Sequence, residues 1–146
     1  MVAIALLSIA ALYLTAHTTL ERSGKTTVTV ALARRIVEDM RSIPFNSLVA
    51  LDNFDTDDPS SLPANEPERD IARRWRYAVA GDGVGWSYTA TEMLNWPTFA
   101  VSGAAMRGVI EVDSPSTSMR EIIVTIAVPR QPKDVQLATL ISRTVP

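Results

Sequence analysis

Few residues of this chain have the type and spacing that catalysis or metal binding requires. The sequence contains no cysteine and a single histidine, His17. Disulfide scaffolds, cysteine-ligated zinc and thiol nucleophiles are therefore excluded, together with most imidazole chemistry. No Gly-x-Ser-x-Gly elbow occurs, so no serine nucleophile of that kind is present. The sequence predicts a protein that is not an enzyme, with a small enzyme of unrecognised site as an alternative.

The segment Ser23 to Thr26 reads Ser-Gly-Lys-Thr, which resembles the end of a phosphate-binding loop. In such a loop backbone N–H groups and the lysine hold the phosphates. The glycine that should stand five positions before Gly24 is Thr19 here, and helical periodicity runs through the segment. We expect a solvated helical turn that binds no nucleotide.

Three acidic residues, Asp55, Asp57 and Glu66, stand at relative positions 1, 3 and 12, which is part of a calcium-loop pattern. Pro59 occupies the place of a third oxygen ligand, and Ser60 that of the glycine needed for the sharp turn. The sequence therefore favours a solvated acidic loop without a metal or other cofactor, and calcium binding stays open as the alternative.

Aromatic residues gather in one stretch of the sequence. They are Trp75, Tyr77, Trp86, Tyr88 and Trp96. Such rings could form a stacking platform for a sugar or for single-stranded nucleic acid. Core and interface packing is the expectation, because two of them follow the alternation of a strand.

The elements that must position these residues begin with an apolar run. Met1 to Ala16 contains no charged residue, and the whole chain of 146 residues has a formal net charge of -2, which excludes a strongly basic nucleic-acid binder. As a helix this run would be about 24 Å long, somewhat shorter than the roughly 30 Å hydrocarbon core of a bilayer. We expect residues 1–20 to form the membrane half of a long helix. A cleaved signal peptide and a buried core helix are the alternatives.

Residues 21–43 are expected to continue this helix as an amphipathic half. Four apolar residues recur at every fourth position and predict a stripe that packs on a sheet: Val28, Leu32, Ile36 and Met40. Pro44 cannot continue the helical hydrogen bonds, so the helix should end near Ser42 or Ile43. Gly24 is the weak point inside it.

The remainder is expected to be an acidic, proline-rich loop over 44–70 and an antiparallel β domain over 71–146. The loop should be exposed and contribute little to the core. Strands are predicted from Arg74 to Val79 by alternation and from Trp86 to Tyr88 as its return, with a turn at 81–83. Further strands are predicted by β-branched residues at 108–112, 121–128 and 135–141. The fold class is therefore α+β, with the helix covering one face of the sheet.

The order of these segments resembles that of type IV pilins and of the pseudopilins of type II secretion. Met1 to Leu14 resembles their hydrophobic N-terminal helix, and Ala33 to Phe45 resembles the end of that helix in minor pilins. The segments Ile122 to Val128 and Val135 to Ser142 look like their last two strands. One feature of the family is missing: the processing signature, a basic residue and glycine before Phe-Thr-Leu-Ile-Glu, would fall directly upstream of Met1. We expect translation to start upstream of Met1, with a fragment unable to assemble as the alternative.

This resemblance implies a structural subunit of a type IV pilus or of a type II secretion pseudopilus, with a pilin-like fold. It implies a single pass through the bacterial inner membrane, with the β domain in the periplasm or outside the cell. The partners would be other pilin or pseudopilin subunits, a prepilin peptidase and the assembly machinery. The residues expected to pack in the filament core are Ile4, Leu7, Ile9 and Leu12. The alternative function is a membrane-anchored or secreted binding module whose aromatic residues contact a polysaccharide or DNA.

Overall fold

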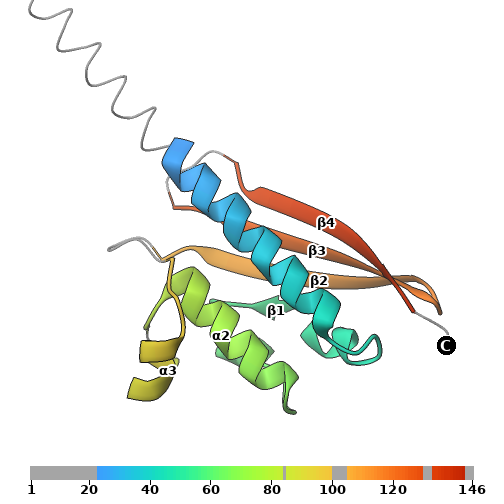
Figure 1. The fold of residues 1–146 in the computed structure, drawn as a ribbon, viewed down its shortest axis with the longest axis horizontal. Coiled ribbons are helices and arrows are strands. Elements are labelled where there is room, and N and C mark those ends of the chain that lie inside the picture. Colours follow the sequence, from blue (N-terminus) through green and yellow to red (C-terminus); the bar gives the residue numbers. More distant parts are fainter. Residues whose placement is uncertain (1–22, 84, 100–104, 130–132, 144–146) are drawn as a thin grey trace, which may run out of the picture.

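The chain folds as a four-stranded antiparallel sheet with helices on one of its faces (Figure 1). The structure, a computed structural model, describes residues 23–83, 85–99, 105–129 and 133–143. The strands follow the order β1-β2-β3-β4, so β1 and β4 form the two edges of the sheet. The predicted α+β class with an antiparallel sheet is therefore confirmed.

The first helix is described over residues 23–42 and ends just before Pro44, as predicted. Leu32, Ile36 and Met40 are buried, at 2% exposure or less. Val28 is 36% exposed and does not belong to this stripe; Thr29, with 0% exposure, lies there instead. A spacing of four residues advances 40° beyond each helical turn, so about 120° accumulates between Met40 and Val28.

Segment 44–61 is ordered by three short elements: η1 (Ser47–Leu51), β1 (Phe54–Asp55) and η2 (Pro59–Ser61). Leu48, Leu51 and Phe54 are at most 1% exposed and join the hydrophobic core. The expectation that this segment contributes little to the core is wrong. Three of its acidic residues, Asp52, Asp57 and Asp58, are exposed, so the segment carries charge on its surface and apolar side chains beneath.

Helix α2 (Glu68–Ala80) occupies the place where a strand was predicted from Arg74 to Val79. Every residue from Trp75 to Ala80 is buried, so an alternating pattern and a helical one fit this stretch equally well. Glu68 and Asp70 in its first turn favour the helix, because negative charge is stabilising at a helix N-terminus. The helix ends at Gly81, whose φ of 70° favours glycine.

The return strand predicted from Trp86 to Tyr88 is also absent from the described sheet. The chain runs from there into helix α3 (Ala90–Asn95). Thr89 and Glu92 form a capping box at its start: the Thr89 hydroxyl accepts from the Glu92 N–H, and the Glu92 carboxylate accepts from the Thr89 N–H.

The three long strands match the predictions from β-branched residues. They are β2 (Arg107–Ser116), β3 (Met119–Ala127) and β4 (Val135–Ser142), joined antiparallel in sequence order. Ile122, Val124 and Ile126 of β3 are completely buried. Burial of such side chains contributes roughly 1.5–3 kcal/mol each, so β3 is the centre of the core.

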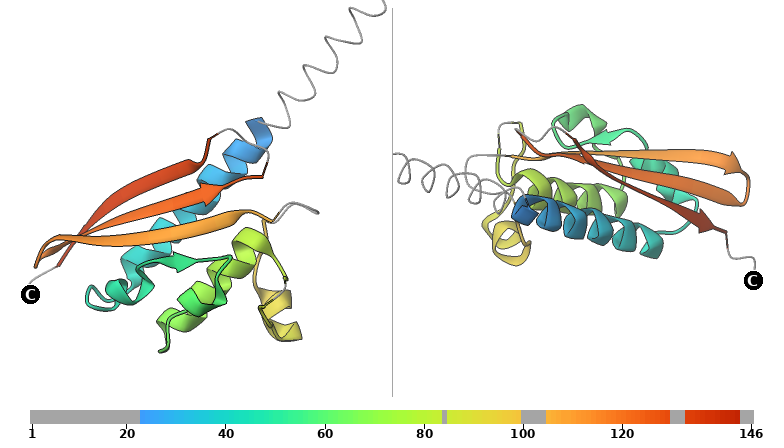
Figure 2. Two further views of the ribbon diagram at one scale, coloured as in Figure 1. Left: turned by 180° about the vertical axis from the view of Figure 1, so that it is seen from behind. Right: turned by 90° about the horizontal axis from the view of Figure 1, so that it is seen from above.

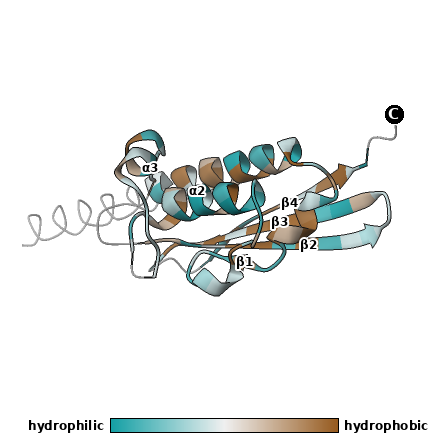
Figure 3. Cartoon of the chain, turned by 90° about the horizontal axis from the view of Figure 1, so that it is seen from below, coloured by the Kyte–Doolittle hydropathy of each residue, from teal (hydrophilic) through white to brown (hydrophobic). Residues whose placement is uncertain are grey.

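The first helix and α2 lie side by side on the same face of the sheet (Figures 2 and 3). Both helices therefore cover the apolar face that β2 and β3 present. Among the residues that the structure describes, no helix combines the length and the apolar character needed to cross a bilayer.

Candidate functional site

The residues expected to form the filament core, Ile4, Leu7, Ile9 and Leu12, lie outside the described residues. The described helix begins at Ser23, and every residue from 23 to 28 is exposed. The segment Ser23 to Thr26 is helical, as predicted, so it does not have the loop geometry of a phosphate site. This end of the helix lies beyond the hydrophobic core, whose first member is Leu32.

Asp39 joins the first helix to α2. Its carboxylate accepts a hydrogen bond from Trp75 Nε1 at 3.0 Å and forms an ion pair with Arg74 Nη2 at 3.2 Å. Trp75 is only 2% exposed, so the carboxylate is the acceptor that this buried indole N–H requires. Asp39 thus holds the two helices in register on the sheet.

Thr29 is a second buried polar residue, near the other end of the helical segment that packs on the sheet. Its hydroxyl donates to the Lys25 carbonyl at 2.8 Å and lies 3.7 Å from Met106 Sδ. This residue is fully buried, and its hydrogen bonds allow a polar side chain to lie where the apolar stripe ends.

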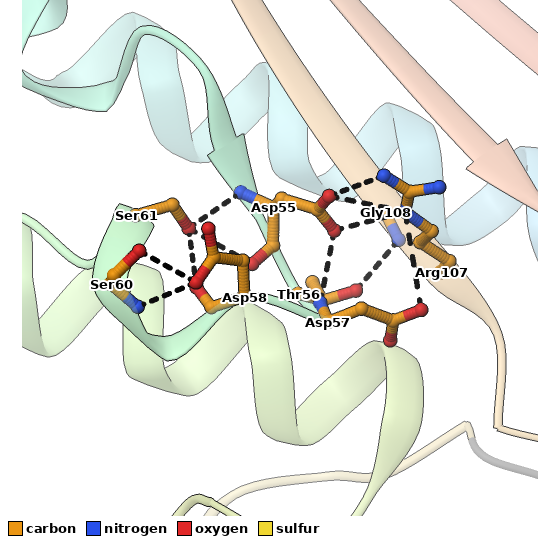
Figure 4. Close-up of polar contacts among 8 residues, drawn as sticks. All are labelled: Asp55, Thr56, Asp57, Asp58, Ser60, Ser61, Arg107 and Gly108. Atoms are coloured by element: carbon orange, nitrogen blue, oxygen red, sulfur yellow. Dashed lines mark hydrogen bonds and ion pairs between the residues drawn. The ribbon is translucent and has the colours of Figure 1, made fainter.

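The acidic segment is tied to the sheet by Arg107 (Figure 4). The Arg107 guanidinium donates to both carboxylate oxygens of Asp55, with Nε 3.1 Å from each. Beside this pair, the Gly108 N–H donates to the Thr56 hydroxyl at 2.8 Å. The hydrogen bond from Arg107 holds the pKa of the Asp55 carboxyl below its ordinary value. Asp55 is therefore a charged carboxylate at neutral pH, and the Arg107 guanidinium of the same chain balances its charge.

This arrangement does not assemble the acidic residues that resembled a calcium loop. Asp55 and Asp57 lie close together, since the Asp57 N–H donates to Asp55 Oδ1 at 2.9 Å. Glu66 instead accepts from the Asp70 N–H at the start of α2, at 2.9 Å. Within the described part of the chain, no group of three or more acidic or histidine side chains is placed to hold a metal ion.

The aromatic residues divide into separate clusters. Tyr77, Tyr88 and Trp96 pack edge to face or tilted, with ring centroids 5.1–6.2 Å apart. Arg73 lies over the rings of Tyr88 and Trp96, at 5.6 and 5.7 Å, and forms an ion pair with Glu92. Burial raises the pKa of Tyr88 to about 12. These contacts attach α3 to α2.

Trp86 belongs to a second cluster. Its ring lies 5.2 Å from the buried guanidinium of Arg76 and 6.4 Å from the ring of Phe54. Arg76 donates to the Gly81 carbonyl at 2.6 Å. With Trp75 in the core, the five aromatic residues do not share one open face, and the rings pack mainly on neighbouring side chains.

A groove that sequence reasoning missed runs between the first helix and β4. It is lined by Arg34, Val37, Glu38, Arg41, Leu137, Ala138 and Thr139. Arg41 Nη2 donates to the Thr139 hydroxyl at 3.2 Å across it. We call this surface the basic groove. A second depression continues it along the helix toward Ser23, and Arg34 and Glu38 line both.

Most of these contacts had no local signal. Asp39 and Trp75, or Asp55 and Arg107, are far apart in the sequence, and only the fold brings them together. A local signal did exist at Thr89 to Glu92, where Thr-x-x-Glu is the spacing of a capping box and could have predicted the start of α3.

Comparisons with protein-family models, with curated protein sequences and with solved structures find no match for this chain.

Proposed function

We propose that this chain is a structural subunit that is anchored in a membrane by its N-terminal residues and assembles into a filament of the pilin or pseudopilin class. One observation carries the proposal. The first helix packs on the sheet from Thr29 onward, whereas residues 23–28 are exposed, and the sequence before them contains the uncharged run Met1 to Ala16. Because residues 23–28 do not pack in the core, the apolar run that precedes them in the sequence would be available to contact a membrane or other subunits.

The composition of that run gives the association its driving force. Burial of Ile4, Leu7, Ile9 and Leu12 would contribute roughly 1.5–3 kcal/mol for each side chain removed from water. The β domain would be carried outside the membrane by the amphipathic half of the helix. By its resemblance to pilins, the chain would lie in the bacterial inner membrane, with a prepilin peptidase and the assembly machinery as partners.

Cell fractionation tests the anchor. The full chain should sediment with membranes, and a variant that lacks residues 1–22 should be soluble and folded, because every residue of the described core lies after that point. Leu7→Arg should reduce the membrane-bound fraction, since an arginine at the centre of an apolar helix costs about 2.5–3.5 kcal/mol on insertion scales. The matched control Leu7→Ile should not. A soluble full chain, or equal behaviour of the two Leu7 variants, would refute the anchor.

A further inference from the structure

The basic groove lies at an edge of the sheet that no described strand covers. β4 is the last strand in the sheet order, and its residues Leu137 to Thr139 line the groove. The lining combines apolar side chains, Val37 and Leu137, with the charged side chains of Arg34, Glu38 and Arg41. Apolar side chains next to arginine are common in protein-binding surfaces.

Among the described residues, the arginines of this groove have no ion-pair partner. Arg34 and Arg41 in the groove, and Arg35 in the depression that continues it, are exposed, and none forms an ion pair with a described carboxylate. Glu38 is the only other charged residue among the described residues that line the groove, and the nearby Asp39 is occupied by Trp75 and Arg74. The groove therefore presents net positive charge.

The side of the domain that carries β1 is acidic. Segment 52–70 contains β1, and five of its carboxylates belong to exposed residues: Asp52, Asp57 and Asp58, which flank β1, and Glu66 and Asp70, at the start of α2. We call these five residues the acidic edge. Arg69 is the only basic residue of the segment. Arg107 is engaged by Asp55 and lies 3.9 Å from the exposed Asp57 carboxylate, so it balances only part of the acidic charge. β1 and β4 lie on opposite sides of β2 and β3 (Figure 1), so the two charged surfaces belong to different edges of one sheet.

We propose that the basic groove receives the acidic edge of a second copy of this chain, an inference that rests on the proposed filament function and names its contact between β domains. Complementary charge steers such an encounter and fixes its orientation. Because the two surfaces differ, each copy still offers a free groove and a free acidic edge after one contact forms. Such a head-to-tail contact continues into a filament unless its rotation closes a ring.

A symmetric contact is disfavoured by the same charges. Pairing of two β4 edges across a two-fold axis would bring the arginines of both grooves together. Like charges in apposition oppose association. The acidic edge therefore fits the groove better than a second groove does.

Disulfide trapping tests this contact, because the chain has no cysteine of its own. Full-length chains carrying Thr139→Cys, in the groove, are mixed in membranes with chains carrying Ala64→Cys, within the acidic segment. The Thr139 hydroxyl faces the groove, where it accepts from Arg41, and Ala64 is exposed. Ala90→Cys, at an exposed position of α3, replaces Ala64→Cys in the control mixture. We expect disulfide dimers in the first mixture, few in the control, and a ladder of higher species when one chain carries both Thr139→Cys and Ala64→Cys.

Charge reversal tests the cause of the contact. Arg34→Glu with Arg41→Glu should reduce the trapped dimer several-fold, and so should Asp57→Lys with Asp70→Lys. Combining the two reversed surfaces, one on each partner chain, should restore trapping. Restored trapping would show that both variants are folded, because two misfolded chains would not regain a specific contact.

Several results would overturn the inference. Dimers of Thr139→Cys alone would indicate symmetric β4 pairing, and equal trapping with Ala90→Cys would indicate random collision. Energy transfer between full-length chains in the same membranes reports assembly through the N-terminal residues separately. Persistent transfer without trapping between the groove and the acidic edge would refute this contact and leave the proposed function standing. The absence of both signals would refute both.

Discussion

Removal of the Asp39 carboxylate should weaken the packing of the first helix against α2. In Asp39→Ala the Trp75 N–H loses its acceptor at a position that is 2% exposed. An unsatisfied buried donor costs about 1–3 kcal/mol. The lost ion pair with Arg74, whose side chain is 35% exposed, adds about 0–1 kcal/mol.

Two effects act in the other direction. Alanine has a higher helix propensity than aspartate, and a carboxylate near the C-terminal end of a helix interacts unfavourably with the helix dipole. Together these two effects stabilise Asp39→Ala by about 0.5–1 kcal/mol. The expected net loss for Asp39→Ala is therefore about 2 kcal/mol. For a chain of this length that lowers Tm by about 4–8 °C.

Urea and thermal unfolding of the variant lacking residues 1–22, followed by circular dichroism, measures this loss. Asp39→Asn keeps an acceptor for Trp75 and should cost less than half as much as Asp39→Ala, and Arg74→Ala should cost at most about 1 kcal/mol. In a Trp75→Phe background the donor is gone, so adding Asp39→Ala should cost little. The reasoning is refuted if Asp39→Ala costs no more than Arg74→Ala, or costs the same in both backgrounds.

Three further predictions use the same unfolding measurement. Ile36→Ala should cost about 2–5 kcal/mol because it leaves a cavity under the sheet, whereas the exposed Arg35→Ala should stay within about 0.5 kcal/mol; equal effects would place the wrong helix face inward. Gly108→Ala should be neutral or stabilising by up to about 1 kcal/mol, since an added Cβ would meet its nearest neighbour at 3.4 Å and φ is not in the left-handed region; a loss above that size would contradict this. Arg107 depresses the pKa of Asp55 in the folded state, so the stability lost in Arg107→Ala should be full at neutral pH and shrink as pH falls below about 4; a difference that grows in acid would be the wrong sign.

The strands were predictable where burial alternates. In β3, Ile122, Val124 and Ile126 face the core, and the residues between them are half-buried, so the period of two is visible in the sequence. Helix α2 was not predictable in this way. From Trp75 to Ala80 all residues are buried, and no periodicity can separate a helix from a strand.

The candidate surfaces were harder to predict from the sequence than the helices and strands. Arg34, Arg41 and Leu137 form one groove only because β4 is placed beside the first helix. Asp55 looked like a metal ligand in the sequence, and its cation in the fold is Arg107. Sequence gives the charge of a segment, whereas the pairing of that charge depends on the topology of the sheet.

Energy transfer between full-length chains in lipid vesicles tests the proposed assembly most directly. Donor and acceptor dyes are attached to chains with a single cysteine at Leu94→Cys, a position that is 85% exposed on α3. If the chains assemble through residues 1–16, transfer should persist when the vesicles are diluted with excess lipid, and should be lost in chains lacking residues 1–22. Transfer that falls on dilution to the level of randomly distributed chains, or a full chain that does not bind vesicles, would contradict the assembly.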